Sequence, residues 1–212
     1  MIQFYTYTTP NGRKVSIMLE ELGIPYQVNV VNISNGEQFE PEFLKVSPNN
    51  KIPAIVDEEA DGLAVFESGA ILTYLAEKYG QFLPASGEEA RYKTLEWLHW
   101  QIGGVGPMFG QLGYFTVYAK EKIPQAIARY TSEAERLLAV MDRRLTDNAY
   151  LAGEAYSIAD MAANPWLVNA CEGAFLGASL GAILAEKPAV LRWLDDVGSR
   201  PAVQRGMAVP VL

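Results

Sequence analysis

The loop at residues 9–12 holds the first side chains with chemical potential. It follows a strand-like segment, residues 2–7, and leads into an amphipathic helical pattern. The N–H groups and the dipole at a helix N-terminus favour a bound anion, including a thiolate. Thr9 and Asn11 can donate hydrogen bonds to a substrate sulfur and keep it ionised, because charge-assisted hydrogen bonds favour the charged form. Judged by the local sequence alone, capping the helix is the commoner role for both residues.

A second group of polar residues is the pair Glu67 and Ser68. The pair ends a strand-like segment, residues 63–66, and begins a further helical pattern. The Ser68 N–H and hydroxyl can bind a carboxylate at a helix N-terminus, while Glu67 can bind an ammonium group. Together they suit an amino-acid head group. The commoner local role of such a pair is that Ser68 caps the helix and Glu67 is a solvated acid beside it.

Pro53 follows Ile52 at the start of another short strand-like segment, residues 52–56. A proline is tolerated in a strand only at a sheet edge or as the first residue. We therefore expect this edge to be free to pair with a peptide-like ligand. Gln38 and Lys51 are expected on loops, from which both can donate to a second carboxylate.

The scarcity of cysteine and histidine limits the possible chemistry. Cys171 is the only cysteine, which excludes an internal disulfide, a CxxC redox pair and a thiolate metal cluster. His99 is the only histidine, so it has no second imidazole with which to share a metal. We expect no metal, and any sulfur chemistry must use the thiol of a bound substrate.

The elements that position these residues form two patterns. Residues 1–83 read as β-α-β-α-β-β-α, with Val15, Met18, Leu19 and Leu22 marking the apolar face of the first helix. Residues 88–212 read as an all-helical domain. Within it, a glycine-rich stretch at 103–110 is expected to break or kink a helix, and Ser157 with Asp160 resembles a capping box.

Composition excludes several classes of partner. Half of the 212 residues are hydrophobic, which is typical of a packed core. The formal net charge of −8 and the absence of clustered Lys and Arg argue against nucleic acid. No apolar run reaches the roughly 18 residues of a membrane helix, so we expect no membrane association and a cytoplasmic location.

Six segments, in order along the chain, resemble those of the soluble glutathione transferases. They are TPNG (9–12), SPNNKIP (47–53), FESGA (66–70), WQIGG (100–104), ARY (128–130) and SIAD (157–160). The resemblance covers essentially the whole chain and is greatest to the nu class, the disulfide-bond oxidoreductase type. It implies a thioredoxin-like N-terminal domain, an all-α C-terminal domain, glutathione as co-substrate and a homodimer.

The same resemblance implies a role for each candidate residue. Pro53 is expected to follow a cis peptide bond, beside which the Ile52 backbone pairs with the cysteinyl part of glutathione. The remaining implied roles are the γ-glutamyl end for Glu67 and Ser68, the glycyl carboxylate for Gln38 and Lys51, the sulfur for Thr9 and Asn11, and a second glutathione for Arg129.

The implied activity is reduction of a small disulfide by bound glutathione, without a protein cysteine. Two alternatives stay open. One is conjugation of glutathione to an electrophile, with Tyr5 or Tyr7 activating the sulfur. The other is a non-enzymatic, glutathione-binding regulatory protein, because the same fold occurs in such proteins. One departure from the close relatives is residues 111–118, which lack their histidines.

Overall fold

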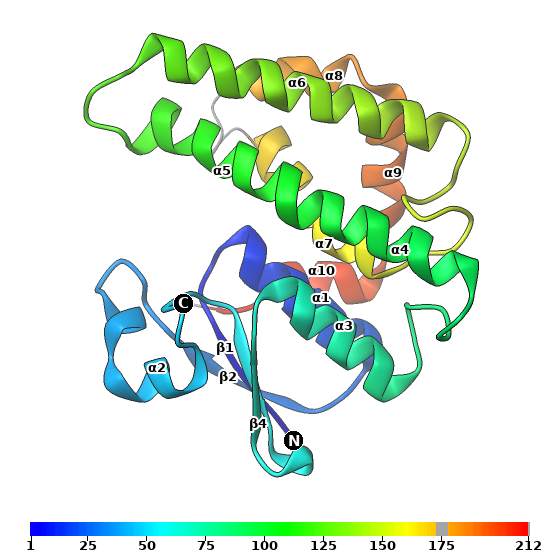
Figure 1. Ribbon diagram of the computed structural model, residues 1–212. Helices are drawn as coiled ribbons and strands as arrows, with labels where there is room; N and C mark the ends of the chain where they lie inside the picture. Colours follow the sequence, from blue (N-terminus) through cyan, green and yellow to red (C-terminus); the bar gives the residue numbers. More distant parts are fainter. Residues whose placement is uncertain (173–177, 212) are drawn as a thin grey trace. The chain divides into compact units, whose positions relative to one another are not determined.

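The computed structural model describes residues 1–172 and 178–211, and the contacts divide the chain into two units (Figure 1). Unit 1 comprises Met1–Leu83 and Arg200–Leu212, and unit 2 comprises Pro84–Ser199. The last segment was predicted to belong to the helical domain, but by its contacts it groups with the first 83 residues.

Unit 1 has the predicted order β-α-β-α-β-β-α. Its elements are β1 (Ile2–Thr6), α1 (Pro10–Leu22), β2 (Tyr26–Val30), the 3₁₀ turn η1 (Glu37–Phe39), α2 (Pro41–Val46), β3 (Ala54–Asp57), the 3₁₀ turn η2 (Glu58–Ala60), β4 (Leu63–Phe66) and α3 (Ser68–Tyr79), followed at the end of the chain by α10 (Pro201–Met207). This is the thioredoxin-like arrangement that the sequence predicted.

The sheet of unit 1 has the strand order β2-β1-β3-β4. β1 pairs with β2 in parallel and with β3 antiparallel, and β3 pairs antiparallel with β4. The expectation of a free edge at β3 was therefore wrong, because Ala54 already faces Tyr5 on one side and Phe66 on the other. Pro53 is tolerated because it precedes the first ladder pair, where no strand hydrogen bond needs its missing N–H.

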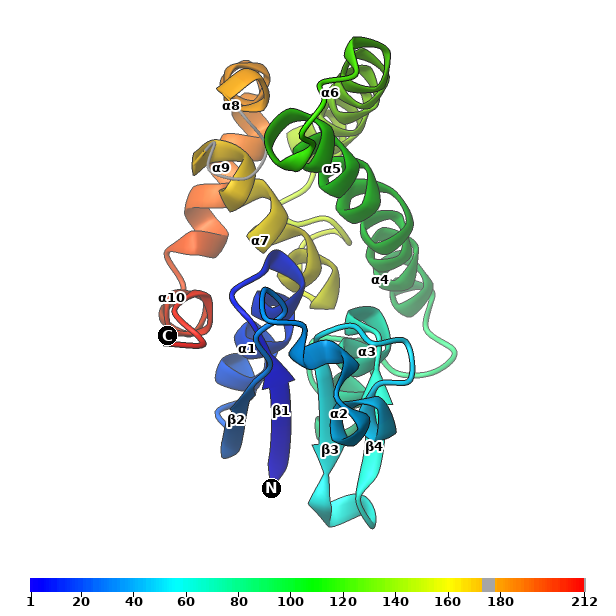
Figure 2. The same ribbon diagram turned by 90° about the vertical axis from the view of Figure 1, so that its left-hand side faces the viewer.

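Helices cover both faces of this sheet. α1 and α3 pack on one face and α2 lies on the other (Figure 2). The predicted apolar stripe of α1 supplies much of the core, since Val15, Met18 and Leu19 are fully buried. α1 ends at Gly23, whose φ of 62° is the left-handed conformation in which glycine is favoured.

The regular elements of unit 2 are all helices over its described residues. Its elements are α4 (Glu89–Trp100), the π-helical turn η3 (Gln101–Val105), α5 (Gly106–Gly113), the π-helical turn η4 (Tyr114–Tyr118), α6 (Pro124–Thr146), α7 (Ile158–Glu172), α8 (Ala178–Ala185) and α9 (Pro188–Gly198). None of the helices in the described ranges has the length and hydropathy that a bilayer-spanning segment needs.

At the glycine-rich stretch, the predicted possibility of a helix break was wrong. The helix does not break there but widens into the π-helical turn η3 and continues as α5 (Figure 1). The small residues serve packing, because a Cβ at Gly106 or Gly110 would lie within 3.6 Å of the Trp166 ring on α7.

The predicted capping box at the start of α7 is confirmed. The Asp160 carboxylate accepts hydrogen bonds from the Ser157 N–H and hydroxyl, both at 3.0 Å. It also accepts from the indole N–H of Trp193 at 2.9 Å, which joins α7 to α9. Burial raises the pKa of Asp160, and these hydrogen bonds oppose that increase.

Candidate functional site

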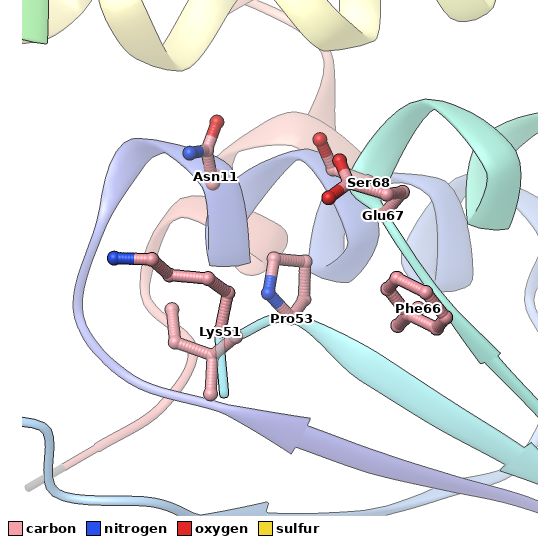
Figure 3. Close-up of a pocket in the computed structure, with 7 residues that line it drawn as sticks. Asn11, Lys51, Pro53, Phe66, Glu67 and Ser68 are labelled. Atoms are coloured by element: carbon pink, nitrogen blue, oxygen red, sulfur yellow. The ribbon is translucent and has the colours of Figure 1, made fainter. Parts of the chain in front are cut away.

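One pocket of unit 1 gathers most of the residues that the sequence singled out (Figure 3). It lies between the start of α1, the turn before β3 and the junction of β4 with α3, and is lined by Asn11, Lys51, Ile52, Pro53, Phe66, Glu67 and Ser68. Its volume is about 130 Å³. Pockets for drug-sized ligands have about 300–1,000 Å³, so this one accommodates part of an extended ligand.

The start of α1 forms the first wall of the pocket. Thr9 is the N-cap, and its Oγ1 accepts a 3.2 Å hydrogen bond from the Gly12 N–H. A Cβ at Gly12 would lie 2.7 Å from the Tyr7 carbonyl oxygen, so only glycine lets the helix start this close to the preceding loop. Asn11 lies between Thr9 and Gly12 in the sequence and is one of the residues that line the pocket (Figure 3).

The turn before β3 forms the second wall. The Ser47 hydroxyl donates a 2.8 Å hydrogen bond to the Lys51 carbonyl, and Asn50 has a left-handed φ of 49°. The Ile52–Pro53 peptide bond is cis, as the resemblance implies. The strand pairs of β3 begin at Ala54. The Ile52 backbone precedes them, so it pairs with neither neighbouring strand there and lies next to the pocket.

The junction of β4 and α3 forms the third wall. Glu67 occupies the N-cap position and Ser68 is the first helical residue, so the prediction that Ser68 caps the helix was off by one residue. Glu67 has φ 72° and ψ 116°, a backbone conformation that is costly for a residue with a side chain. Its side chain does not cap the helix, which leaves the first N–H groups of α3 available for an anion.

Charges lie at separate ends of the pocket. In Figure 3 the Lys51 ammonium extends at one end, whereas the Glu67 carboxylate and the Ser68 hydroxyl lie at the other, beyond Asn11. Such a distribution suits a ligand with an anionic group at one end and an amino-acid head group at the other.

A buried lysine beneath the pocket was missed by the sequence analysis. Lys14 of α1 is 1% exposed, and its Nζ donates to Ser68 Oγ at 3.4 Å. Burial lowers the pKa of Lys14 to about 7, and the nearby Glu67 charge opposes that decrease. Its spacing in the sequence could have indicated that Lys14 is buried. Lys14 precedes the buried Ile17 and Met18 by three and four residues, so it shares their helix face.

Three of the predicted site residues, one catalytic and two glutathione-binding, do not line this pocket within the described part of the chain. Thr9 acts as the helix cap, the commoner role noted above. Gln38 lies on η1 rather than on a loop. Arg129 lies on α6 of unit 2, where its exposed guanidinium is 3.6 Å from the Glu133 carboxylate.

The two tyrosines of the conjugation alternative are also absent from the described lining of the pocket. Tyr5 packs against the Phe43 ring of α2, with 6.1 Å between centroids, on the opposite face of the sheet from α1. Phe66 does line the pocket, although no role was predicted for it.

Family models match both parts of the chain. The model described as the N-terminal domain of glutathione S-transferase matches residues 8–78, and the model described as its C-terminal domain matches residues 124–196. Together they span more than half of the chain and include the three walls of the pocket.

Similar proteins are found over nearly the full length. Disulfide-bond oxidoreductase YfcG of Escherichia coli is 49% identical, over 98% of this chain and 94% of its own, and disulfide-bond oxidoreductase YghU of the same organism is 44% identical, over 98% and 74%. Among solved structures, a glutathione transferase family member from Pseudomonas fluorescens with two bound glutathiones has a TM-score of 0.93 at 49% identity, covering 99% of this chain and 93% of that one. A glutathione transferase from Pseudomonas putida with one glutathione disulfide per subunit has a TM-score of 0.92 at 46% identity, covering 99% and 91%.

Proposed function

The chain belongs to the glutathione S-transferase family, and we propose that it reduces small disulfides with bound glutathione. The observation that carries this proposal is the composition of the pocket: an asparagine amide at a helix N-terminus, and neither cysteine nor tyrosine among its described residues. Two relatives, 49% and 44% identical, are disulfide-bond oxidoreductases, and related structures hold two glutathiones or glutathione disulfide.

Glutathione binds in this proposal with its γ-glutamyl end at the start of α3. The Ser68 hydroxyl and the N–H groups of that helix hold the α-carboxylate, and Glu67 holds the ammonium group. The Ile52 backbone, which lies beyond the end of the ladder, pairs with the cysteinyl unit. The strained Glu67 backbone supports this assignment, because such conformations concentrate at ligand sites.

The other end of glutathione is assigned to Lys51 and Gln38, which approach the glycyl carboxylate. The ammonium of Lys51 at the far end of the pocket supports its part in this assignment. Arg129 is assigned to a second glutathione.

Asn11 is the proposed catalytic residue. Its amide N–H donates to the glutathione sulfur, and the α1 N-terminus adds a favourable field, so that the thiolate forms near neutral pH. Thr9 is assigned to the same sulfur. Its Oγ1 already accepts from the Gly12 N–H, so the hydroxyl hydrogen remains as the donor.

The reaction then has two exchange steps. A glutathione thiolate attacks one sulfur of the substrate disulfide, forms a mixed disulfide and releases half of the substrate as a thiolate, which takes a proton from water. A second glutathione thiolate attacks the glutathione sulfur of the mixed disulfide and releases the other half. Two glutathiones are oxidised to one glutathione disulfide, and one substrate disulfide is reduced to two thiols.

Turnover of bis(2-hydroxyethyl) disulfide tests the proposal, with glutathione disulfide formation coupled to glutathione reductase. Asn11→Ala should lower kcat about 10- to 100-fold with little change in KM, because a hydrogen bond to a charged group contributes about 1.5–3 kcal/mol. Asn35→Ala, a change at an exposed asparagine, is the matched control. Wild-type turnover by a folded Asn11→Ala variant would refute the role of Asn11.

The alternatives correspond to distinct outcomes of related assays. Conjugation to an electrophile that falls with Tyr7→Phe but not with Asn11→Ala would favour the tyrosine mechanism. Glutathione binding without turnover of disulfides or electrophiles would favour a regulatory protein.

We also propose that the protein is a cytoplasmic homodimer. Leu63 and Phe66 on the edge strand β4 and Tyr92 on α4 are exposed apolar side chains of the kind that subunit interfaces cover. Light scattering coupled to size-exclusion chromatography should give twice the mass of the single chain, which is 23.3 kDa. A monomer at micromolar concentration would refute the dimer.

A further inference from the structure

Lys14 is a charged side chain in a place where apolar residues are expected. It is 1% exposed, and its neighbours along α1, Val15, Ile17 and Met18, form part of the core. Burying an ammonium costs free energy unless other groups compensate. A lysine at this position therefore calls for a reason beyond packing.

The hydrogen bond from Lys14 links the interior of α1 to the pocket. Its Nζ lies 3.4 Å from the Oγ of Ser68, which is itself 6% exposed and lines the pocket. An ammonium group can only donate hydrogen bonds, so the Ser68 oxygen must accept. The Ser68 hydroxyl hydrogen is then directed elsewhere and can be donated to an anion in the pocket.

A neutral amine would reverse this arrangement. An uncharged Lys14 has a lone pair that can accept the Ser68 hydroxyl hydrogen, which would leave the serine oxygen facing the pocket as an acceptor. An acceptor repels a carboxylate. The proton on Lys14 thus determines whether Ser68 attracts or repels an anionic ligand.

We infer that Lys14 is a positioning residue for the carboxylate site at the start of α3, acting through Ser68, and that its protonation is linked to binding of the ligand carboxylate. This inference rests on the proposed glutathione site. The inference adds Lys14, which does not itself line the pocket, to the residues that determine binding. It also adds a pH dependence of ligand binding that is separate from ionisation of the glutathione thiol.

The charges around Lys14 support the linkage. Burial lowers the pKa of Lys14 to about 7, and Glu67 is the charged side chain whose field raises it. The acidic residues of α1 are paired further away. Arg200 and Arg205, from the α10 segment, pair with Glu21 and Glu20, which begin roughly 9 Å from Lys14 along the helix axis. A ligand carboxylate near Ser68 adds a second negative charge beside the ammonium, so binding should raise the Lys14 pKa and take up a proton.

Titration calorimetry with S-methylglutathione tests the inference, because this ligand has no thiol to ionise. Affinity of the wild-type protein should fall between pH 6.5 and 8.5, by up to about tenfold per pH unit above the Lys14 pKa. At pH 7.5, buffers that differ in ionisation enthalpy should reveal proton uptake. Lys14→Met should bind about 5- to 30-fold more weakly at pH 6.5, with a smaller pH dependence and less uptake, since about 1–2 kcal/mol is lost with such an interaction.

The matched control is Lys45→Met, which removes an exposed lysine of α2. This control should retain the wild-type affinity and pH dependence. Because the ligand amine titrates equally with both variants, its contribution cancels when their affinities are compared at each pH. Ser68→Ala keeps Lys14 but removes the group through which it acts, so its pH dependence should also flatten. This second variant keeps the test informative if Lys14→Met fails to fold.

Two results would overturn the inference. One is a folded Lys14→Met variant with the affinity, pH dependence and proton uptake of the wild type. The other is a Ser68→Ala variant with the full wild-type pH dependence. In both cases the wild type still binds the ligand, so the proposed function stands, whereas a wild type that binds no S-methylglutathione refutes the proposed function as well.

Discussion

The hydroxyl of Ser16 donates a 2.7 Å hydrogen bond to the carbonyl of Gly206, joining the first helix of unit 1 to its last. The backbones are so close here that a Cβ on Gly206 would lie 2.6 Å from the Ile17 Cα. α10 therefore contributes to the packing of α1, whose N-terminus forms one wall of the pocket. Residues 190 positions apart thus affect the same site.

Gly206→Ala should destabilise the protein. The added methyl group meets backbone atoms of Ile17, which cannot rotate away, and overpacking of this kind costs about 1–3 kcal/mol. Chemical denaturation measures the loss in the free energy of unfolding. Gly198→Ala is the control, because no described atom lies within 4 Å of its added Cβ, and a cost equal to that of Gly206→Ala would contradict the packing argument.

Gly12→Ala should impair the site more than the fold. Its Cβ would lie 2.3 Å from the Thr6 hydroxyl oxygen and 2.7 Å from the Tyr7 carbonyl oxygen, so the start of α1 must shift and carry Asn11 with it. Glutathione-dependent turnover should fall at least tenfold, as expected for a misplacement of about 1 Å. Gly23→Ala, at the other end of α1, should cost about 1 kcal/mol of stability but leave turnover intact.

Asn11→Ala should raise the pKa of the bound glutathione thiol. Loss of a hydrogen bond to the thiolate, worth about 1.5–3 kcal/mol, corresponds to about one to two pH units. Titration of the ultraviolet absorbance of the bound thiolate measures this pKa directly. An unchanged titration would show that another group stabilises the thiolate.

Asp57→Asn should weaken stability at neutral pH and have little effect in acid. Asp57 is fully buried, which raises its pKa, but hydrogen bonds from Lys78 at 2.5 Å and Tyr74 at 2.6 Å outweigh burial and lower it. The folded pKa lies below the unfolded value of about 3.9, so the stabilisation is present above that pH and is lost as pH falls through the folded pKa. Urea denaturation at pH 7 should show a loss of about 1–3 kcal/mol that shrinks towards pH 3.

Lys14→Met should stabilise the protein while weakening ligand binding. The folded pKa of Lys14 is about 7 and its ordinary value is 10.5. Below pH 7 the lysine is charged in both states, so the folded state bears the full cost of burying the ammonium. Between pH 7 and about 10.4 the unfolded state binds more protons, and wild-type stability rises with pH by up to about 1.4 kcal/mol per pH unit.

The Lys14→Met variant has no ammonium to bury, so its stability lacks the rise with pH that Lys14 gives the wild type. Its advantage in the free energy of unfolding should therefore be largest below pH 7 and should shrink towards pH 10. Paired denaturation series of the two proteins measure this difference and cancel the other titrating groups. A difference that does not change with pH would show that Lys14 does not titrate in the folded protein.

Much of the fold was determined by local sequence. The apolar spacing of Val15, Met18 and Leu19 identified α1, because residues three and four apart lie on the same face of a helix. Gly23 identified the end of α1, because glycine is favoured at a helix C-terminus. The capping box of Ser157 and Asp160 was recognisable for the same reason. Most of the pocket residues were identified because each stands next to a predicted strand end or helix start.

Tertiary structure alone decided the other features. β3 became an inner strand because β1 and β4 both pair with it, and the pattern of residues 52–56 cannot specify its neighbours. The packing of Tyr5 against Phe43 of α2, on the face of the sheet opposite to α1, was likewise decided by tertiary contacts. The contact of Lys14 with Ser68 spans 54 residues and that of Ser16 with Gly206 spans 190, and only the folded chain, with its backbone closely packed, brings such distant residues together.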